Sequence, residues 1–432
     1  MNTPQNSNFL YDVIVVGLGA HGSATFFHLA KQGLKVLGLE RFELAHTQGS
    51  SHGDTRITRK MVFEHPVYVD LVTEAYEAFE ELSKIANRPI FKQTGGLFMG
   101  KPDSDLIKQC LHVAKAKSLP IKILNSKQIN QLNPQFDLQG KDDIVGVYDQ
   151  EAGVLFPENC IQSFVEQGIK RYGGRVQTGT RYISHSIVLP PKEDPGSKTV
   201  HETVYEVVTD CGIFRTKKIV FSCGMWNTQI INAPLEIRKI QLFWFKVPEN
   251  VNMDLDHCPI FMYEVDRNPL YYVYGFPNYQ GSGIKVGFSP NQHNNITQSP
   301  DRPIRTVEPQ EKTRLVHMMK EFLPNIGRQP VVDEKECFVT MTPDENFIID
   351  FDPNDKNILY LSPCSAHGFK YSGGVGRLAA RMIKHGRHED QYNMFRLNRF
   401  ENQNVQWSDL FIKQDLAYNP FSKYFQKLTA KL

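Results

Sequence analysis

Apolar and polar residues change their period twice within the first forty positions of the chain. Residues 11–17 form a continuous apolar run, rich in β-branched side chains, which predicts a buried strand of a parallel sheet. Apolar residues then recur at helical spacing over 20–32, and Gly33 stands just past that predicted helix. A second strand is predicted over 35–39, and Glu40 follows it. The pattern predicts a strand-helix-strand crossover, the smallest unit of a right-handed parallel sheet.

The rest of the chain alternates between helical and strand periods and contains no internal repeat. Helical spacing predicts helices over 68–86 and 104–116, and a late helix over 374–383 that begins after glycines. Between 237 and 288, aromatic and β-branched residues alternate with polar ones, as in an antiparallel sheet with one covered face. We therefore expect an α/β fold with a parallel and an antiparallel sheet. Further strands are predicted over 90–100, 175–187, 204–223 and 358–361, and polar loops over 190–200 and 291–309.

Composition and charge exclude several classes of partner. The 432 residues carry 49 Lys and Arg against 47 Asp and Glu, a net charge of +2 without a long basic block, so nucleic acid is not an expected partner. The apolar runs fall far short of the roughly 20 residues that span a membrane, so no membrane is expected either. The N-terminus lacks the pattern of a secretory signal, and the seven cysteines form no CxxC pair. Neither disulfides nor structural zinc are therefore expected.

Residues 17–22, Gly-Leu-Gly-Ala-His-Gly, are a GxGxxG motif between the first predicted strand and helix. Gly17 permits the tight turn, Gly19 lets the backbone approach a pyrophosphate at the helix N-terminus, and Gly22 allows close packing of helix on strand. Glu40 follows about 20 residues on, where it can accept hydrogen bonds from an adenosine ribose. The arrangement predicts a dinucleotide site, and by itself it leaves FAD and NAD open.

A loop of small, polar and basic residues follows Glu40. Residues 46–59 combine glycines, serines and histidines with two arginines three positions apart, which is unusual for a loop that only faces solvent. His46 and His52 do not predict a metal site, because no third ligand lies at a known spacing. The composition therefore favours a functional loop and no metal.

Six longer motifs stand in one order along the chain: DVIVVG at 12–17, HGDTRI at 52–57, GVLFPENC at 153–160, GFP at 275–277, DENFIID at 344–350 and HGFKYSGGVG at 367–376. In these motifs the sequence resembles the monomeric sarcosine oxidase group of FAD-dependent amine oxidases, which includes peroxisomal pipecolate and sarcosine oxidases. The resemblance implies a Rossmann-like FAD-binding lobe and a second, antiparallel-sheet substrate lobe. We expect a discontinuous FAD-binding domain over 1–94, 154–235 and 340–432, and a substrate domain over 95–153 and 236–339.

The resemblance implies roles for individual active-site residues. Arg59 and Lys370 match the pair that clamps the substrate carboxylate, and Lys285 matches the lysine that assists the reaction with oxygen. Arg56 and Tyr274 match further catalytic positions. Residue chemistry agrees, because a carboxylate away from water needs cationic donors and a cation favours the negative charge that develops on oxygen. The alternatives are a structural salt bridge for Arg59 and a solvent-facing lysine for Lys370. The glycines around both favour close approach of a ligand.

Cys337 stands where the family forms a thioether to the flavin, so the resemblance implies covalently bound FAD. Local chemistry alone favours a structural cysteine, because the neighbouring Glu334 and Glu336 disfavour a thiolate. The implied cofactor-binding residues are Gly17, Gly19, Gly22, Glu40, Ser51, His52, Thr55, Cys337, His367, Gly368 and Lys370.

The implied function is oxidation of a secondary-amine L-amino acid, of the L-pipecolate, saccharopine or sarcosine type, to an imine, with O2 reduced to hydrogen peroxide. Ser289 stands where sarcosine oxidases carry a histidine four residues beyond Lys285, which favours the bulkier substrates. A flavin dehydrogenase with another electron acceptor and an FAD-binding protein without turnover are the alternatives.

The last three residues, Ala430-Lys431-Leu432, resemble the Ser-Lys-Leu address that the peroxisomal import receptor reads. An oxidase that releases hydrogen peroxide suits a peroxisome. We therefore expect this receptor as a partner and the peroxisome as the location.

Overall fold

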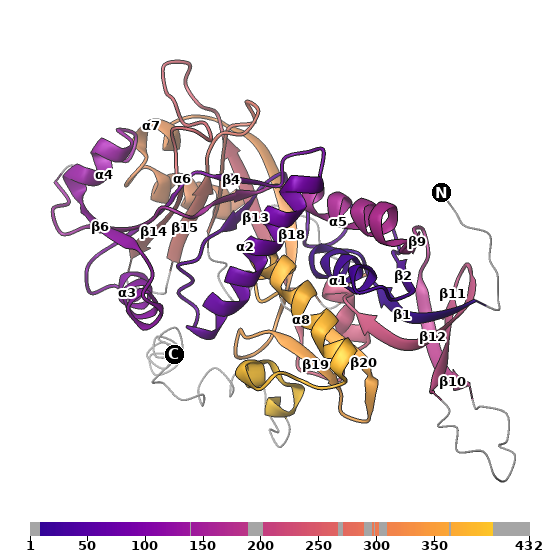
Figure 1. Ribbon diagram of the computed structural model, residues 1–432. Coiled ribbons are helices and arrows are strands. Elements are labelled where there is room, and N and C mark those ends of the chain that lie inside the picture. The colour runs from indigo at the N-terminus through magenta and orange to yellow at the C-terminus, as the bar shows by residue number, and fades with distance from the viewer. Residues whose placement is uncertain are drawn as a thin grey trace, which may run out of the picture.

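The computed structural model describes residues 9–138, 140–188, 202–266, 271–288, 296–297, 299–301, 309–362 and 364–400. The predicted loop 190–200, Ser289 and the terminal tripeptide lie outside these residues. Figure 1 shows two lobes side by side, with helices α2 (Val67–Ile85) and α8 (Ser372–His385) crossing the middle of the view. Each lobe contains one large sheet.

The first lobe is built on an eight-stranded sheet, counted over the described residues. Its centre is parallel, as predicted: β1 pairs with β2 and β12, β2 with β9, and β12 with β20. Antiparallel strands extend it, because β12 also pairs with β11, β11 with β10, and β20 with β19. The strands are β1 (Leu10–Val16), β2 (Val36–Leu39), β9 (Arg175–Gln177), β10 (Tyr182–Val188), β11 (Val204–Thr209), β12 (Gly212–Phe221), β19 (Ile348–Asp352) and β20 (Asp355–Ser362).

Helices α1 (Ala20–Lys31), α5 (Pro157–Tyr172) and α8 pack on this sheet, and α2 packs against α5 and α8. The late helix predicted over 374–383 is present, although it begins two residues earlier than predicted. The structure starts α8 at Ser372, so Gly373 and Gly374 lie inside it. A Cβ on Gly374 would lie 2.1 Å from the carbonyl oxygen of Leu71 in α2. These glycines therefore permit close helix packing rather than close approach of a ligand.

The second lobe is built on a nine-stranded, mostly antiparallel sheet, counted within the described ranges. The long strand β13 pairs with β18 along its whole length and with β16 on its other edge. Helices α3 (Asp105–Lys117), α4 (Ser126–Leu132), α6 (Pro309–Met319) and α7 (Pro324–Gly327) belong to this region of the chain. The strands are β5 (Gly96–Gly100), β6 (Ile121–Asn125), β7 (Val145–Asp149), β13 (Glu236–Phe245), β14 (Ile260–Asp266), β15 (Tyr271–Phe276), β16 (Ile284–Phe288), β17 (Ile296–Thr297) and β18 (Val331–Met341).

A small sheet of β3 (Arg56–Thr58), β8 (Gly153–Leu155) and β4 (Phe91–Gln93) completes the described strands. The two large sheets draw their strands from the two predicted sets of segments, while the division into domains stays a prediction. Short 3-10 helices are η1 (Gly224–Gln229), η2 (Phe369–Tyr371), η3 (Asp390–Phe395) and η4 (Leu397–Phe400).

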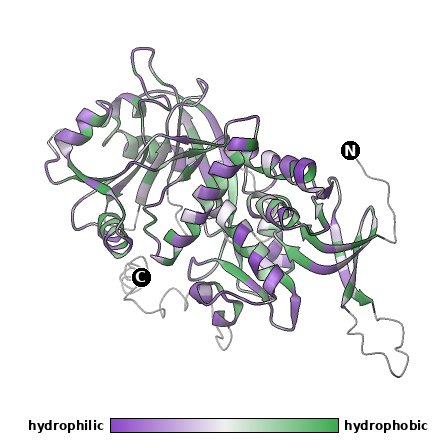
Figure 2. Ribbon diagram, viewed as in Figure 1, coloured by the Kyte–Doolittle hydropathy of each residue, from purple (hydrophilic) through white to green (hydrophobic). Residues whose placement is uncertain are grey.

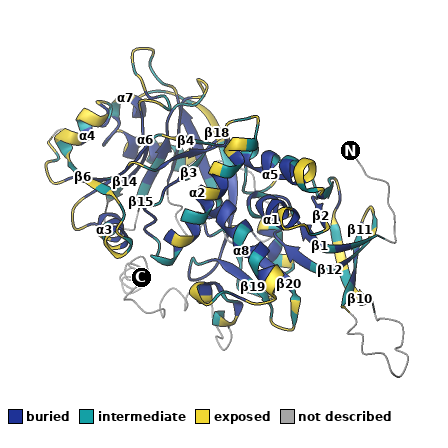
Figure 3. Cartoon of the chain, in the orientation of Figure 1, coloured by how far each residue is buried: buried dark blue, intermediate teal, exposed yellow. Residues whose placement is uncertain are grey.

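Hydrophobic residues follow the strands of both sheets, and hydrophilic residues mark the outward turns of the helices (Figure 2). Figure 3 shows the corresponding burial: α1 is almost wholly buried, whereas α4 exposes its outer face. Among the described residues, no helix is long and apolar enough to cross a membrane. All seven cysteines are free.

Candidate functional site

A cavity of about 510 Å³ lies between the two large sheets. One side is formed at the carboxyl ends of β1, β2, β12 and β20, where a parallel sheet commonly binds its ligand. The other side is formed by strands of the second sheet, which contribute Leu242, Tyr272, Lys285 and Cys337. The parallel centre of the first sheet and strands of the second, mostly antiparallel sheet thus enclose one cavity.

The glycine motif forms the turn between β1 and α1, as predicted. Gly17 has φ +89°, and a Cβ there would lie 2.4 Å from the Ser222 carbonyl oxygen. A Cβ on Gly22 would lie 1.8 Å from the carbonyl oxygen of Gly17, so this glycine serves packing. The first turn of α1 holds no acidic residue, and its N-cap Gly19 makes no side-chain capping bond. The helix therefore presents its positive end to the cavity, which suits a pyrophosphate.

Glu40 lies in the cavity wall and also supports the turn itself. Its Oε2 accepts a hydrogen bond from the Leu18 amide at 2.8 Å, and its Oε1 accepts one from the Phe42 amide at 3.0 Å. His46 Nε2 lies 3.5 Å from Oε1. Because each carboxylate oxygen has two lone pairs, Glu40 retains acceptor capacity for a ribose.

Lys285 is buried on β16 and reaches the loop after Gly49. Its Nζ donates to the carbonyls of Gly53 and Thr55 at 2.7 and 2.8 Å, and lies 3.3 Å from Thr55 Oγ1. Burial, followed by the charge on Arg56, lowers the pKa of Lys285 well below its usual value. The three acceptors in turn favour the ammonium form.

Arg56, Cys337 and Tyr274 line the cavity beside Lys285. Arg56 donates to the carbonyls of Thr55 and Ser50, each at 2.8 Å, and its Nη2 lies 3.9 Å from Cys337 Sγ. Cys337 stands in β18, where successive side chains point to opposite faces, so Glu336 lies on the other face of the strand. Cys337 Sγ therefore lies beside the Arg56 guanidinium, on the opposite face of the strand from its acidic neighbour Glu336.

Arg59 and Lys370, predicted to act together, converge on Glu64. Arg59 Nη2 lies 2.8 Å and Lys370 Nζ 3.2 Å from Glu64 Oε1. Burial opposes ionisation of Glu64, but Arg59, Lys370 and His367 outweigh it and lower its pKa. Burial lowers the pKa of Lys370 to about 7, although Glu64 raises it. Lys370 is buried, so the alternative of a solvent-facing lysine is wrong.

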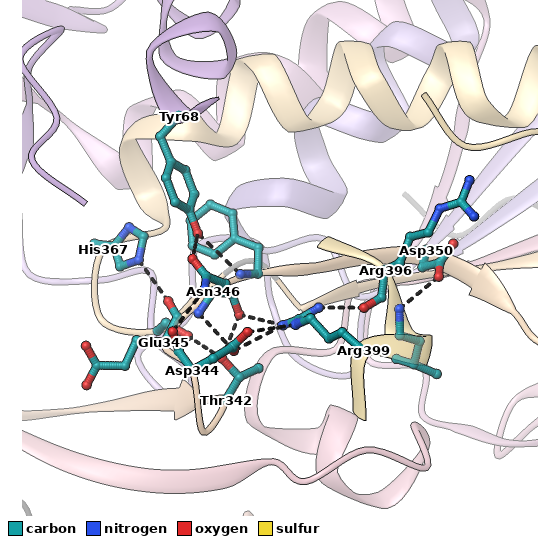
Figure 4. A network of polar contacts seen from close by, with 12 residues as sticks. Tyr68, Thr342, Asp344, Glu345, Asn346, Asp350, His367, Arg396 and Arg399 are labelled. Atoms are coloured by element: carbon teal, nitrogen blue, oxygen red, sulfur yellow. Dashed lines mark hydrogen bonds and ion pairs between the residues drawn. The ribbon is translucent and has the colours of Figure 1, made fainter. Parts of the chain in front are cut away.

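His367 lies between this ionic cluster and a buried turn. Its Nδ1 is 3.5 Å from Glu64 Oε1, its Nε2 is 3.3 Å from the Glu345 carbonyl, and its ring stacks on Phe347 at 4.8 Å. Burial is the largest cause that lowers the pKa of His367 to about 4, so it is neutral at pH 7. Arg399 holds the same turn through Asp344, with Nε 2.8 Å from Oδ2 (Figure 4).

Most predicted site residues line the cavity, but Gly22, His52 and Thr55 do not. Gly22 packs under the turn, His52 is buried, and Thr55 contacts Lys285 instead of the cavity. Within the described parts of the chain, no group of three or more His, Cys, Asp or Glu residues is suited to a metal ion. Lining residues that sequence reasoning missed include Ser50, Phe63, Glu64, Met262, Tyr272 and Cys364.

Comparison with known proteins identifies the class. Residues 12–382 match the family described as FAD dependent oxidoreductase, and the chain belongs to this family. The protein is therefore an FAD-dependent oxidoreductase. The turn at Gly17, the uncapped start of α1 and Glu40 would hold the adenosine and pyrophosphate, and Lys285, Arg56 and Cys337 would surround the flavin ring.

Two curated relatives cover nearly the whole chain. Monomeric sarcosine oxidase of Bacillus sp. (strain NS-129) is 33% identical over 398 residues, which cover 90% of this chain and 97% of the relative. N-methyl-L-tryptophan oxidase of Yersinia pestis (strain Pestoides F) is 28% identical over 394 residues, covering 90% and 99%.

Solved structures show the same fold. L-proline dehydrogenase from P. horikoshii has a TM-score of 0.75 at 19% identity, covering 92% of this chain and 99% of that one. Fructosamine oxidase from Aspergillus fumigatus (Amadoriase II) has a TM-score of 0.72 at 20% identity, covering 93% and 92%. The α/β fold with its two sheets is thus confirmed.

Proposed function

We propose that the protein is an oxidase of secondary-amine L-amino acids, which converts the C–N bond to an imine and reduces O2 to hydrogen peroxide. The convergence of Arg59 and Lys370 on one carboxylate oxygen of Glu64 carries the proposal. Two buried cations at such a point give a substrate carboxylate both charge and direction. FAD, when bound, accepts the two electrons of the amine and passes them to O2, which takes up two protons to become hydrogen peroxide.

The wall beside the cations supports a substrate with an apolar body. Phe63, Met262 and Tyr272 line the cavity, and Arg59 lies over the Phe63 ring, with its guanidinium carbon 4.1 Å from the ring centroid. The two relatives are named for sarcosine and for N-methyl-L-tryptophan, which are both N-methyl amino acids. Within the proposed class we favour L-pipecolate and other bulkier members over sarcosine, because the aromatic and aliphatic side chains of this wall would contact the ring of L-pipecolate.

Lys285 is proposed to serve the reaction with oxygen. Its buried amino group is held by backbone carbonyls, and in its charged form it would stabilise negative charge as electrons reach O2. Attachment of FAD through Cys337 is also proposed, because Cys337 lines the same cavity as Lys285.

A substrate panel under anaerobic conditions tests the proposal. L-pipecolate, L-proline, sarcosine, N-methyl-L-tryptophan and saccharopine are each mixed with the purified enzyme while the flavin absorption band is followed. At least one secondary-amine acid should bleach the band, and admission of air should restore it with one hydrogen peroxide per turnover. Bleaching that only an artificial acceptor reverses would indicate a dehydrogenase, and no bleaching by any secondary-amine acid would contradict the proposed substrate class.

A further inference from the structure

Glu158 and Lys285 both hydrogen-bond to the backbone of the loop of residues 53–55. Glu158 Oε1 accepts hydrogen bonds from the amide of Gly53 at 2.7 Å and from that of Asp54 at 3.2 Å. Lys285 Nζ donates to the carbonyls of Gly53 and Thr55. The carboxylate thus takes the amides of the loop, and the ammonium takes its carbonyls.

The loop has a backbone conformation that needs such support. Gly53 has φ +99°, and Asp54 has φ +66°, which an L-residue with a side chain rarely adopts. Glu158 is well placed to stabilise it, because Pro157 begins α5 and fixes Glu158 in the first turn of that 16-residue helix. A carboxylate is also favourable at a helix N-terminus.

We propose that Glu158 is a positioning residue for Lys285. By holding loop 53–55, it sets where the two carbonyls stand and therefore where the Lys285 ammonium lies in the cavity. Glu158 itself does not line the cavity. Burial lowers the pKa of Lys285, but the negative charge of Glu158 raises it, and Glu158→Gln, which keeps the acceptor oxygen but not the charge, separates this effect from the hold on the loop. The inference rests on the proposed function, since the oxygen role of Lys285 belongs to that proposal.

Rapid-mixing kinetics of Glu158→Ala test the inference. Reoxidation of the substrate-reduced enzyme by O2 should slow by about 10- to 100-fold, the cost of a misplaced group near the reacting atoms, while anaerobic reduction by substrate changes little. Glu158→Gln keeps an acceptor oxygen and should restore most of the reoxidation rate. Glu166→Ala is the matched control, because Glu166 lies on the same helix and its Oε1 lies 2.9 Å from Arg88 Nη2, away from the loop.

Two further measurements extend the test. The first does not depend on turnover, and the second uses a different loop variant. Hydrogen-deuterium exchange of a peptide covering residues 50–56 should be faster in Glu158→Ala than in Glu166→Ala, with or without substrate. Gly53→Ala perturbs the same loop, because its φ is unfavourable for alanine and its Cβ would lie 3.6 Å from Lys285 Nζ. It should likewise slow reoxidation more than reduction.

Lys285→Met distinguishes a failure of the proposed oxygen role of Lys285 from a failure of the positioning role of Glu158. If Lys285→Met fails to slow reoxidation, the proposed oxygen role itself is wrong. If Lys285→Met slows reoxidation but Glu158→Ala and Gly53→Ala leave it at the control rate, the positioning role of Glu158 is wrong. An equal loss in both half-reactions for both loop variants would also overturn it, because the loop would then support the whole site.

Discussion

Arg59 Nη2 lies 2.8 Å from Glu64 Oε1 in the wall of the cavity, with side-chain exposures of only 4% and 14%. Lys370 reaches the same oxygen, while the buried Oε2 has no hydrogen-bond partner among the described residues. The chain thus places its own carboxylate where we propose that the substrate carboxylate binds. The carboxylate of a substrate must therefore replace Glu64 as the ion-pair partner of Arg59 and Lys370.

Removing either cation should weaken substrate binding selectively. Arg59→Met and Lys370→Met each leave a buried anion under-paired, at a cost of about 2 to 5 kcal/mol, which is roughly 30-fold or more in affinity. The corresponding amide carries no carboxylate, so in both variants the difference in affinity between the acid and the amide should narrow. Titration of the flavin spectrum with both ligands measures this. Lys60→Met is the control, because Lys60 pairs with Glu151 outside the cavity lining. Equal losses for acid and amide would make the two cations structural.

Binding of a carboxylate inhibitor should weaken as the pH rises through about 7. Burial lowers the pKa of Lys370 to about 7, and a lysine is charged only below its pKa. Glu64→Gln removes the charge that raises this pKa, so in that variant the loss should begin at lower pH. Inhibitor titrations from about pH 5 to about pH 9 measure the step. A step of the same size and position in Lys370→Met would assign it to another group.

Acid precipitation should leave the flavin with the protein pellet, and Cys337→Ser should release it to the supernatant. The reason is the place of Cys337 in the cavity wall, where its Sγ lies 3.9 Å from Arg56 Nη2. Cys364→Ser is the matched control, because Cys364 also lines the cavity. Flavin in the supernatant of the unaltered protein would exclude a thioether.

The parallel centre of the fold could be predicted because its signals are local. The buried run at β1, the glycines at 17–22 and the acid at the end of β2 each follow from spacing within a crossover of about 30 residues. Helix α5 was missed, although Pro157 followed by a first-turn acid is a helix-start pattern. Alternation over 237–288 predicted an antiparallel sheet, but local signals do not give the strand order of the nine-stranded sheet, which pairs distant strands such as β5 and β14.

The site was only partly predictable for the same reason. Lys285, Arg59 and Lys370 were assigned by resemblance, and the structure brings each to the cavity. Glu64 was missed because an acid five positions after Arg59 has no special spacing in a loop. Its role depends on Lys370, which lies 306 positions further along the chain. Only the folded chain shows this pairing.

Arg399→Ala should destabilise the protein by about 3 kcal/mol or more, because removing one partner of a buried ion pair leaves the other charge without compensation. Asp344 is only 2% exposed, and Arg399 also donates to the Asn346 carbonyl at 3.1 Å (Figure 4). Denaturant unfolding of the flavin-loaded protein measures the change. Arg377→Ala, which removes a more exposed pair with Glu77, should cost about 1 kcal/mol or less. Equal effects would show that the Asp344 pair contributes no more than a surface pair.

We also propose import into peroxisomes through Ala430-Lys431-Leu432. A fluorescent protein fused to the N-terminus leaves the tripeptide free, and it should appear in peroxisomal puncta. Deletion of the three residues should make the fluorescence diffuse. Diffuse fluorescence of both fusions would contradict the proposal.

The walls of the cavity come from positions as far apart as Val16 and Lys370. During synthesis the glycine turn leaves the ribosome early, whereas Lys370 and α8, which packs on α1, follow several hundred residues later. No nascent fragment that ends before Lys370 contains the whole lining of the pocket. Binding of the cofactor by the complete pocket therefore requires a chain that extends past Lys370, and a chain truncated ahead of Lys370 would lack the stabilisation that a bound ligand gives the finished protein.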